Sequence, residues 1–214
     1  MNSTQRIALI GSNGKAGSVI LSELIANHFH VNALVREHKN IPNISSDLLH
    51  VHVGDATNEE VLISLIKDCD VIINACSNRG NKAPVSLAIT KNINKLVNNN
   101  TRYFVITGKT VKSTTDEFSL STVLQRIILS KMYPEIVKNK QEEYAFLQQS
   151  SIPWTLIRCP LLVDGDTRKY SVSERKCKGK QITKNSLAAF LITEIGNAKY
   201  MQKCPFVFNK KKID

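Results

Sequence analysis

Short apolar runs alternate with helix-like stretches along the first half of the chain. The runs have the length of buried strands, and the stretches between them repeat apolar residues at helical spacing. This alternation indicates βαβ units and a parallel sheet covered on both faces, which is a doubly wound, Rossmann-like α/β fold. The predicted strands are residues 7–10, 31–35, 48–53, 71–73 and 103–106, and the predicted helices include residues 19–25, 61–66 and 85–96.

The second half of the chain is less regular. Residues 110–132 are rich in Ser and Thr at first and then apolar, which predicts a loop and a short helix lying over a site. Pro134 suits the first turn of a helix that runs to about Gln149, because a missing N–H costs nothing there. The remaining predictions are a strand at 154–157, a small hairpin or irregular excursion at 168–180, a helix at 186–195 and a terminal strand at 206–208.

The length and composition favour one ordinary globular unit. The 214 residues are 42% hydrophobic and 22% charged, and no internal repeat or linker divides them. We therefore expect a single domain over residues 1–214, with residues 160–214 forming the substrate side. No apolar run reaches the ~20 residues that span a bilayer, and no signal peptide is evident, so we expect a cytoplasmic protein.

The net charge and the cysteine content exclude few classes of binding partner. The net charge of +11 could suit nucleic acid, an anionic membrane surface or phosphate-bearing ligands, or reflect nothing more than lysine-rich usage. The lysines are scattered and no aromatic residues interleave with them, which disfavours nucleic acid. The five cysteines form no C-x-x-C pair, so we expect free thiols and no metal site.

A glycine-rich turn follows the first predicted strand and opens the first predicted helix. It has the form G-x-x-G-x-x-G, in which Gly11 allows a tight turn, Gly14 a close approach to a pyrophosphate and Gly17 close helix–strand packing. The N–H groups of the helix N-terminus would bind the phosphates. The alternative is an ordinary turn between a strand and a helix. The turn residues assigned to a dinucleotide are Gly11, Asn13, Gly14, Lys15, Ala16 and Gly17.

The end of the second strand distinguishes NADP from NAD. An NAD site needs an acidic residue there for the ribose 2′-hydroxyl, whereas this chain has Arg36, whose guanidinium can pair with a 2′-phosphate. Arg36 could instead be a surface arginine, and Glu37 could still reach a ribose. Asp55, after the third strand, is placed either to touch the adenine or to cap the helix near Asn58. We favour NADP(H), with NAD(H) as the alternative.

These segments together resemble the NmrA-like, atypical short-chain dehydrogenases, and most closely their biliverdin reductase B (flavin reductase) branch. The resemblance rests on residues 7–17, 33–36, 54–57, 71–81, 140–160 and 182–191. It implies a Rossmann-like domain that binds NADP(H) with the nicotinamide facing a shallow pocket. It also implies that Ala56, Cys76, Ser77 and Thr107 lie at the cofactor, and that Gly108 lines the same pocket.

The acid–base residues of these relatives are missing from their expected positions. The Y-x-x-x-K pair of the standard enzymes keeps Lys140, but Ile136 stands four residues before it. The flavin reductase branch has Ser where this chain has Gly108 and His where it has Leu161. The residues left as catalytic candidates are Lys140, Thr107 and Tyr133.

Lys140 lies on an apolar face of its predicted helix. A lysine among apolar neighbours needs an anion, and a cofactor ribose or phosphate would serve; alternatively its stem packs and its head reaches water. Tyr170 and Arg175 lie in a variable segment, where they either contact substrate or remain on the surface.

Two functions remain open from the sequence. The first is an NADPH-dependent oxidoreductase that passes a hydride to a flavin, a quinone or a small carbonyl compound. The second is a non-catalytic NADP(H) sensor of the NmrA type that acts through a protein partner. An epimerase or dehydratase is a lesser alternative, since those enzymes usually have a larger C-terminal substrate domain than this chain could hold. Either reading allows a monomer or a homodimer.

Overall fold

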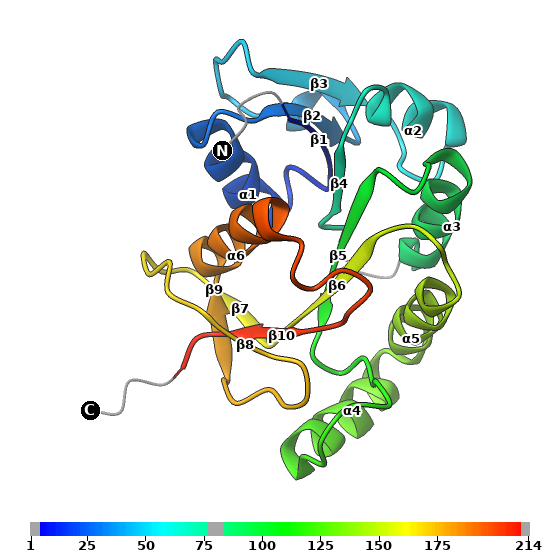
Figure 1. The fold of residues 1–214 in the computed structure, drawn as a ribbon, viewed down its shortest axis with the longest axis vertical. Coiled ribbons are helices and arrows are strands. Elements are labelled where there is room, and N and C mark those ends of the chain that lie inside the picture. Colours follow the sequence, from blue (N-terminus) through cyan, green and yellow to red (C-terminus); the bar gives the residue numbers. More distant parts are fainter. Residues whose placement is uncertain (1–4, 77–83, 211–214) are drawn as a thin grey trace.

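The computed structural model describes residues 5–76 and 84–210 and contains one large, mostly parallel sheet flanked by helices (Figure 1). The strand order is β3-β2-β1-β4-β5-β6-β10-β8. Because the order reverses between β1 and β4, the sheet has the switch point at which doubly wound folds bind ligands. The strands of this sheet are β1 (Arg6–Ile10), β2 (His30–Val35), β3 (Leu49–Val53), β4 (Val71–Asn74), β5 (Arg102–Gly108), β6 (Trp154–Cys159), β8 (Ser171–Ser173) and β10 (Phe206–Phe208).

Helices cover the two faces of the sheet in separate groups. On one face α1 packs against α6, and on the other face α2, α3 and α5 lie side by side. The helices are α1 (Gly17–Ala26), α2 (Glu59–Ile66), α3 (Ser86–Leu96), α4 (Leu120–Met132), α5 (Pro134–Gln148) and α6 (Lys184–Asn197), with a 3₁₀ turn at His38–Asn40. None of the described helices is long and apolar enough to cross a membrane.

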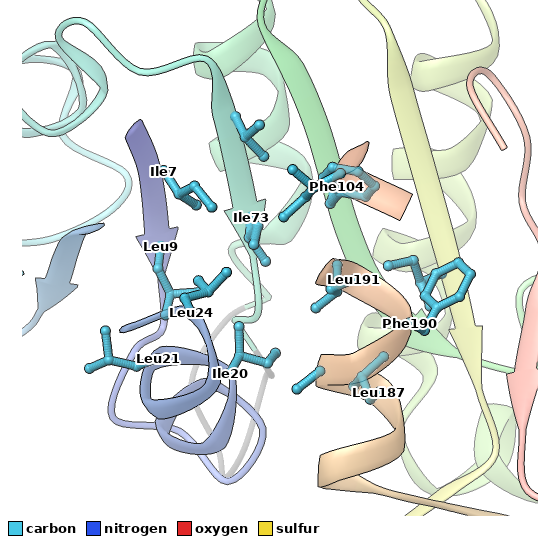
Figure 2. Close-up of a cluster of buried hydrophobic side chains, with 14 of the residues drawn as sticks. Ile7, Leu9, Ile20, Leu21, Leu24, Ile73, Phe104, Leu187, Phe190 and Leu191 are labelled. Atoms are coloured by element: carbon cyan, nitrogen blue, oxygen red, sulfur yellow. The ribbon is translucent and has the colours of Figure 1, made fainter. Parts of the chain in front are cut away.

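The core is divided between the two faces because successive residues of a strand point to opposite sides. In β1, Ile7 and Leu9 join the cluster under α1 and α6, whereas Ala8 and Ile10 join the cluster under α2, α3 and α5. Figure 2 shows the first cluster, where side chains of α1 and of α6 meet over β1, β4 and β5. Both faces are buried, which explains the continuous apolar runs in the sequence.

The second half differs in detail from the sequence predictions. The helix expected to be short is α4, and it spans 13 residues because no Gly or Pro interrupts 119–133. Residues 168–180 form no hairpin, because β8 pairs with β10 far along the chain. A small second sheet, unexpected from the sequence, joins β7 (Leu161–Val163) to β9 (Gln181–Thr183). Within 160–214, β10 extends the main sheet and α6 packs on α1.

Candidate active site

The carboxyl ends of β1, β2 and β3 open onto a cavity of about 460 Å³, which we term the dinucleotide groove. Parallel strands bring these ends to one edge of the sheet, at the switch point. The groove therefore joins residues that are distant in sequence. Its lining includes Gly11, Asn13, Gly14, Leu34, Val35, Arg36, Glu37, Asn40, Gly54, Asp55, Ala56, Ala75, Cys76, Val85 and Ile89.

The glycine turn is held so closely that two of its positions exclude a side chain. Gly11 has φ +82°, and a Cβ there would lie 3.0 Å from the backbone of Ala75 and of Cys76. A Cβ on Gly17 would lie 1.9 Å from the carbonyl oxygen of Gly11, whereas one on Gly14 would meet only that oxygen, at 3.1 Å. Gly11 and Gly17 thus shape the turn, and Gly14 leaves space in the groove.

The start of α1 follows the glycine turn directly, and the Ser18 N–H donates to the carbonyl of Gly14 at 2.9 Å. No side chain caps the first turn, because the N-cap residue is Ala16. The buried Ser12 hydroxyl donates to the carbonyl of Leu34 at 2.9 Å and fixes the turn against β2. A rigid turn with uncapped N–H groups is the usual site for a phosphate.

Asp55 lies in the groove and does not cap α2. Its carboxylate accepts hydrogen bonds from the backbone N–H and the hydroxyl of Thr57, at 2.8 and 2.7 Å. Asn58 is the cap, since its side chain accepts from the N–H groups of Glu60 and Val61. The alternative role of Asp55 as the helix cap is therefore wrong.

A second cavity, of about 340 Å³, adjoins the groove and shares Ala75 and Cys76 with it; we term it the central cavity. Its walls come from the ends of β4, β5 and β6 and from α4, α5 and α6. They are mostly apolar, which suits a planar organic ring. The lining residues are Lys15, Ala16, Ala75, Cys76, Ile106, Thr107, Gly108, Thr110, Val111, Leu129, Tyr133, Ile136, Val137, Lys140, Cys159, Pro160, Leu162 and Leu187.

Lys140 forms an ion pair with Glu143 of the same helix. Its Nζ donates to the Ser86 hydroxyl at 2.5 Å and to Glu143 Oε2 at 3.2 Å. Glu143 is fully buried, and its other oxygen accepts from Ser86 and Thr90 at 2.6 and 2.7 Å. An ammonium has three donors, and the described residues use two of them, which leaves one N–H for a ligand in the cavity that Lys140 lines.

The network continues inward to Tyr103, which the sequence did not single out. Thr90 donates to Glu143, so the Tyr103 hydroxyl, 2.8 Å away, donates to Thr90 and accepts from Asn74 at 3.1 Å. Burial raises the pKa of Tyr103 well above its ordinary value, and the Glu143 charge adds to this effect. Tyr103 therefore stays protonated and stabilises the site without exchanging protons. Only the i, i+3 spacing of Lys140 and Glu143 was a sequence signal for this network.

Thr107 and Tyr133 also line the central cavity, from different sides. The Thr107 hydroxyl is buried and has no hydrogen-bond partner among the described residues, which is costly unless a ligand supplies one. Tyr133 joins α4 to α5 and is 49% exposed. The structure thus brings together all three catalytic candidates, Thr107, Tyr133 and Lys140.

Other sequence candidates lie elsewhere. Ile136 and Gly108, which replace catalytic residues of the relatives, line the central cavity, whereas Leu161 is exposed outside it. Tyr170 packs edge-on against Phe190 in the core. Ser77 lies outside the described residues. No cluster of potential metal ligands occurs within residues 5–76 and 84–210.

Residues 11–198 match the family described as NAD(P)H-binding. The chain belongs to this NAD(P)H-binding family. The match covers the glycine turn and nearly all of the residues that line both cavities, so the cofactor is a nicotinamide dinucleotide, as the sequence predicted at this level.

Solved structures with the same fold cover nearly the whole chain. A putative epimerase from Bacteroides thetaiotaomicron has a TM-score of 0.81 and 22% identity, with 99% of this chain and 100% of that chain covered. ChuY, an anaerobillin reductase from Escherichia coli O157:H7, has a TM-score of 0.78 and 17% identity, with 99% of each chain covered. SP1627, a putative NADH-flavin reductase from Streptococcus pneumoniae, has a TM-score of 0.77 and 19% identity, with 96% and 100% covered. At these identities the likeness shows the fold.

One curated relative matches over a shorter stretch. The fatty acid hydroxylase uhd1 of Mycosarcoma maydis is 35% identical over 86 residues, which are 38% of this chain and 29% of that protein. The matched segment spans less than a third of that protein.

The residues present fit a nicotinamide dinucleotide in the NAD(P)H-binding protein. The glycine turn leaves space at Gly14, and uncapped N–H groups at the start of α1 suit a pyrophosphate. The Thr107 hydroxyl has no hydrogen-bond partner among the described residues, and a polar group of the cofactor in the central cavity could supply one. The two cavities meet at Ala75 and Cys76, so one elongated ligand can occupy both.

Proposed function

We propose that this protein is an NADPH-dependent oxidoreductase that reduces a flavin, a quinone or a small carbonyl compound. The observation that carries the proposal is the apolar central cavity that joins the dinucleotide groove at the switch point. The groove has room for the nucleotide and the central cavity for an acceptor ring. The reductases among the structural neighbours support the same reaction class.

The bound cofactor would supply a hydride from its nicotinamide ring. Val111, Leu129 and Leu162 line the central cavity, where they would orient a planar ring and exclude water. The Thr107 hydroxyl and the remaining donor of Lys140 would hold polar groups of the cofactor or acceptor. Tyr133 is half-exposed and can pass a proton between acceptor and solvent. A flavin or quinone can also take its protons from water, so the missing Tyr at Ile136 does not prevent this chemistry.

The direct test is oxidation of NADPH with FMN, a simple quinone and a small aldehyde as acceptors. We expect tight NADPH binding, seen by fluorescence titration, and steady loss of absorbance at the nicotinamide band with at least one acceptor. Absence of binding by NADPH and NADH would overturn the proposal, and the glycine turn would then be purely structural.

Arg36 is expected to select NADPH over NADH. It lines the dinucleotide groove, where its guanidinium would pair with the 2′-phosphate. Arg36→Ala should raise the Kd for NADPH about 10- to 100-fold and change that for NADH less than about twofold. Lys67→Ala removes the same charge at an exposed position outside the groove and should change neither Kd. A parallel change for both cofactors would assign Arg36 another role.

Cys76 offers a chemical probe of cofactor binding. Burial raises the pKa of its thiol above the ordinary value, and the nearby Lys140 charge offsets only part of this. Alkylation at pH 7.5 should therefore be slower than for a free thiol, should accelerate as pH rises beyond the ordinary thiol range, and should be blocked by NADP⁺. Peptide mass spectrometry would follow Cys76 beside Cys177, which lies outside both cavities and should keep its rate. Equal protection of both cysteines would argue against a cofactor at Cys76.

One observation favours the second function, a non-catalytic NADP(H) sensor that acts through a protein partner. Helix α4 contacts mainly α5, and none of its described side chains is buried. Its exposed apolar side chains are Leu120, Val123, Leu124, Ile127, Ile128 and Met132. Such a surface is typical of a protein interface. Tight NADPH binding without turnover across a broad acceptor panel would favour the sensor over the reductase.

A further inference from the structure

A third cavity, of about 370 Å³, adjoins the central cavity, and we term it the outer cavity. The two cavities share Thr110 and Val111 as a common wall. The outer cavity is distinct from the dinucleotide groove, with which it shares no lining residue. Its lining residues are Thr110, Val111, Lys112, Asp116, Glu117, Phe118, Ser119, Thr122, Val123, Arg126, Arg175, Lys176, Cys177 and Phe206.

One face of α4 roofs both cavities. Thr122, Val123 and Arg126 line the outer cavity, and Leu129 and Tyr133 follow along the helix to line the central cavity. These positions are spaced by one, three, three and four residues, which places them on one side of the helix. At ~1.5 Å per residue, the centres of the two groups are separated by roughly 10 Å along the roof.

The wall between the cavities is firmly held. The Lys112 backbone exchanges two hydrogen bonds with the Gln141 side chain, at 2.9 and 3.0 Å. The Ser113 hydroxyl accepts from Tyr144 at 3.0 Å. Thr110 and Val111 therefore keep a fixed position between the two cavities, and a ligand that spans both would run along α4, which lines both.

Both carboxylates that line the outer cavity are paired with arginines, whereas three of its basic side chains form no ion pair with a described residue. Asp116 accepts from the buried Arg158 at 2.7 and 2.8 Å, and Glu117 lies 3.2 Å from Arg175. Lys112, Arg126 and Lys176 form no ion pair with any residue that the structure describes. Arg126 and Lys176 are half-buried. A partly enclosed cavity with an excess of cations attracts an anion.

We propose that the outer cavity binds an anionic arm of the acceptor while the acceptor ring occupies the central cavity. This deepens the proposed reductase function and rests on it. The arm is a phosphate or a carboxylate about 10 Å from the ring, held chiefly by Arg126 and Lys176. Phe118, Val123 and Phe206 contact the apolar part of the arm. Arg126 and Lys176 are thus specificity determinants of the acceptor.

The test compares two flavins that differ by one phosphate. Binding of FMN and of riboflavin to the NADP⁺-loaded protein is measured by quenching of flavin fluorescence, which requires no turnover. We expect FMN to bind at least about tenfold more tightly, because a charge-assisted hydrogen bond is lost in riboflavin. Arg126→Gln and Lys176→Gln should each weaken FMN binding about three- to tenfold and leave riboflavin within about twofold.

Lys131→Gln is the matched control. Lys131 is an exposed cation on the same helix and lines neither cavity, so its loss should change binding of neither flavin. Circular dichroism and thermal unfolding verify that each variant folds. A naphthoquinone with a carboxyalkyl chain, compared with its methyl ester, repeats the test for a carboxylate arm.

Each outcome is decisive. A loss confined to the charged member of a pair supports the outer cavity as the anion site and tells phosphate from carboxylate. Equal binding of charged and neutral members, equal loss for both, or no loss in Arg126→Gln and Lys176→Gln overturns it. Selective FMN binding without NADPH oxidation by any acceptor of the panel would retain this site and refute the reductase. Oxidation of NADPH by riboflavin and FMN with equal affinity for both flavins would support the reductase and refute the anion site.

Discussion

Replacing Arg158 with Met is expected to lower the free energy of unfolding by about 3–5 kcal/mol. Arg158 is fully buried, and its guanidinium carbon lies 3.6 Å from the centre of the Phe206 ring. The guanidinium donates to the carboxylate of Asp116. It also donates to the backbone carbonyls of Val111, Cys204 and Glu174. Methionine can fill much of the space but donates nothing, so these buried acceptors lose their partner. Denaturant unfolding followed by circular dichroism measures the change.

Two controls distinguish the loss of the buried Arg158 hydrogen bonds from the loss of a positive charge. Lys138→Met removes one member of an exposed ion pair with Glu142, 3.9 Å apart, and should change the unfolding free energy by less than about 0.5 kcal/mol. The Arg158→Met, Asp116→Asn double variant should lose less stability than the sum of the losses in the two single variants, because the two side chains interact. A loss of unfolding free energy below about 1 kcal/mol in Arg158→Met would show that the buried hydrogen bonds of Arg158 contribute little to stability.

Replacing Gly17 with Ala is expected to destabilise the fold by about 3 kcal/mol or more. The added Cβ would lie 1.9 Å from the carbonyl oxygen of Gly11, a backbone atom that cannot move aside without distorting the turn. The gain in helix propensity, about 1 kcal/mol, is too small to compensate. Thermal or denaturant unfolding would measure the loss, and NADPH binding should fall with it.

Gly14→Ala is the matched control for Gly17→Ala. Its Cβ would meet only the carbonyl oxygen of Gly11, at 3.1 Å, so we expect a stability change below about 1 kcal/mol. Gly14 nevertheless lines the dinucleotide groove, and NADPH binding should weaken about tenfold or more. If Gly14→Ala unfolds the protein as readily as Gly17→Ala, the separation of roles within the turn is wrong.

The parallel sheet and the class of cofactor could be predicted from the sequence. Strands buried on both faces must be continuously apolar, and a glycine turn between β1 and α1 needs only local residues, so both leave a signal along the chain. The fold class and the nicotinamide cofactor were correctly predicted for this reason. The positions of Lys140 and Thr107 at one cavity followed from the family resemblance.

The contacts of the candidate residues depend on long-range packing and could not be predicted from the sequence. Lys140 meets Ser86 and Glu143 because α3 and α5 pack side by side, and Ser86 carries no sequence signal for this contact. Likewise β8 pairs with β10 rather than within its own segment, since short strands of three residues have too little pattern to fix a partner. Local sequence encodes periodicity and turns, whereas long-range packing decides which side chains share a cavity.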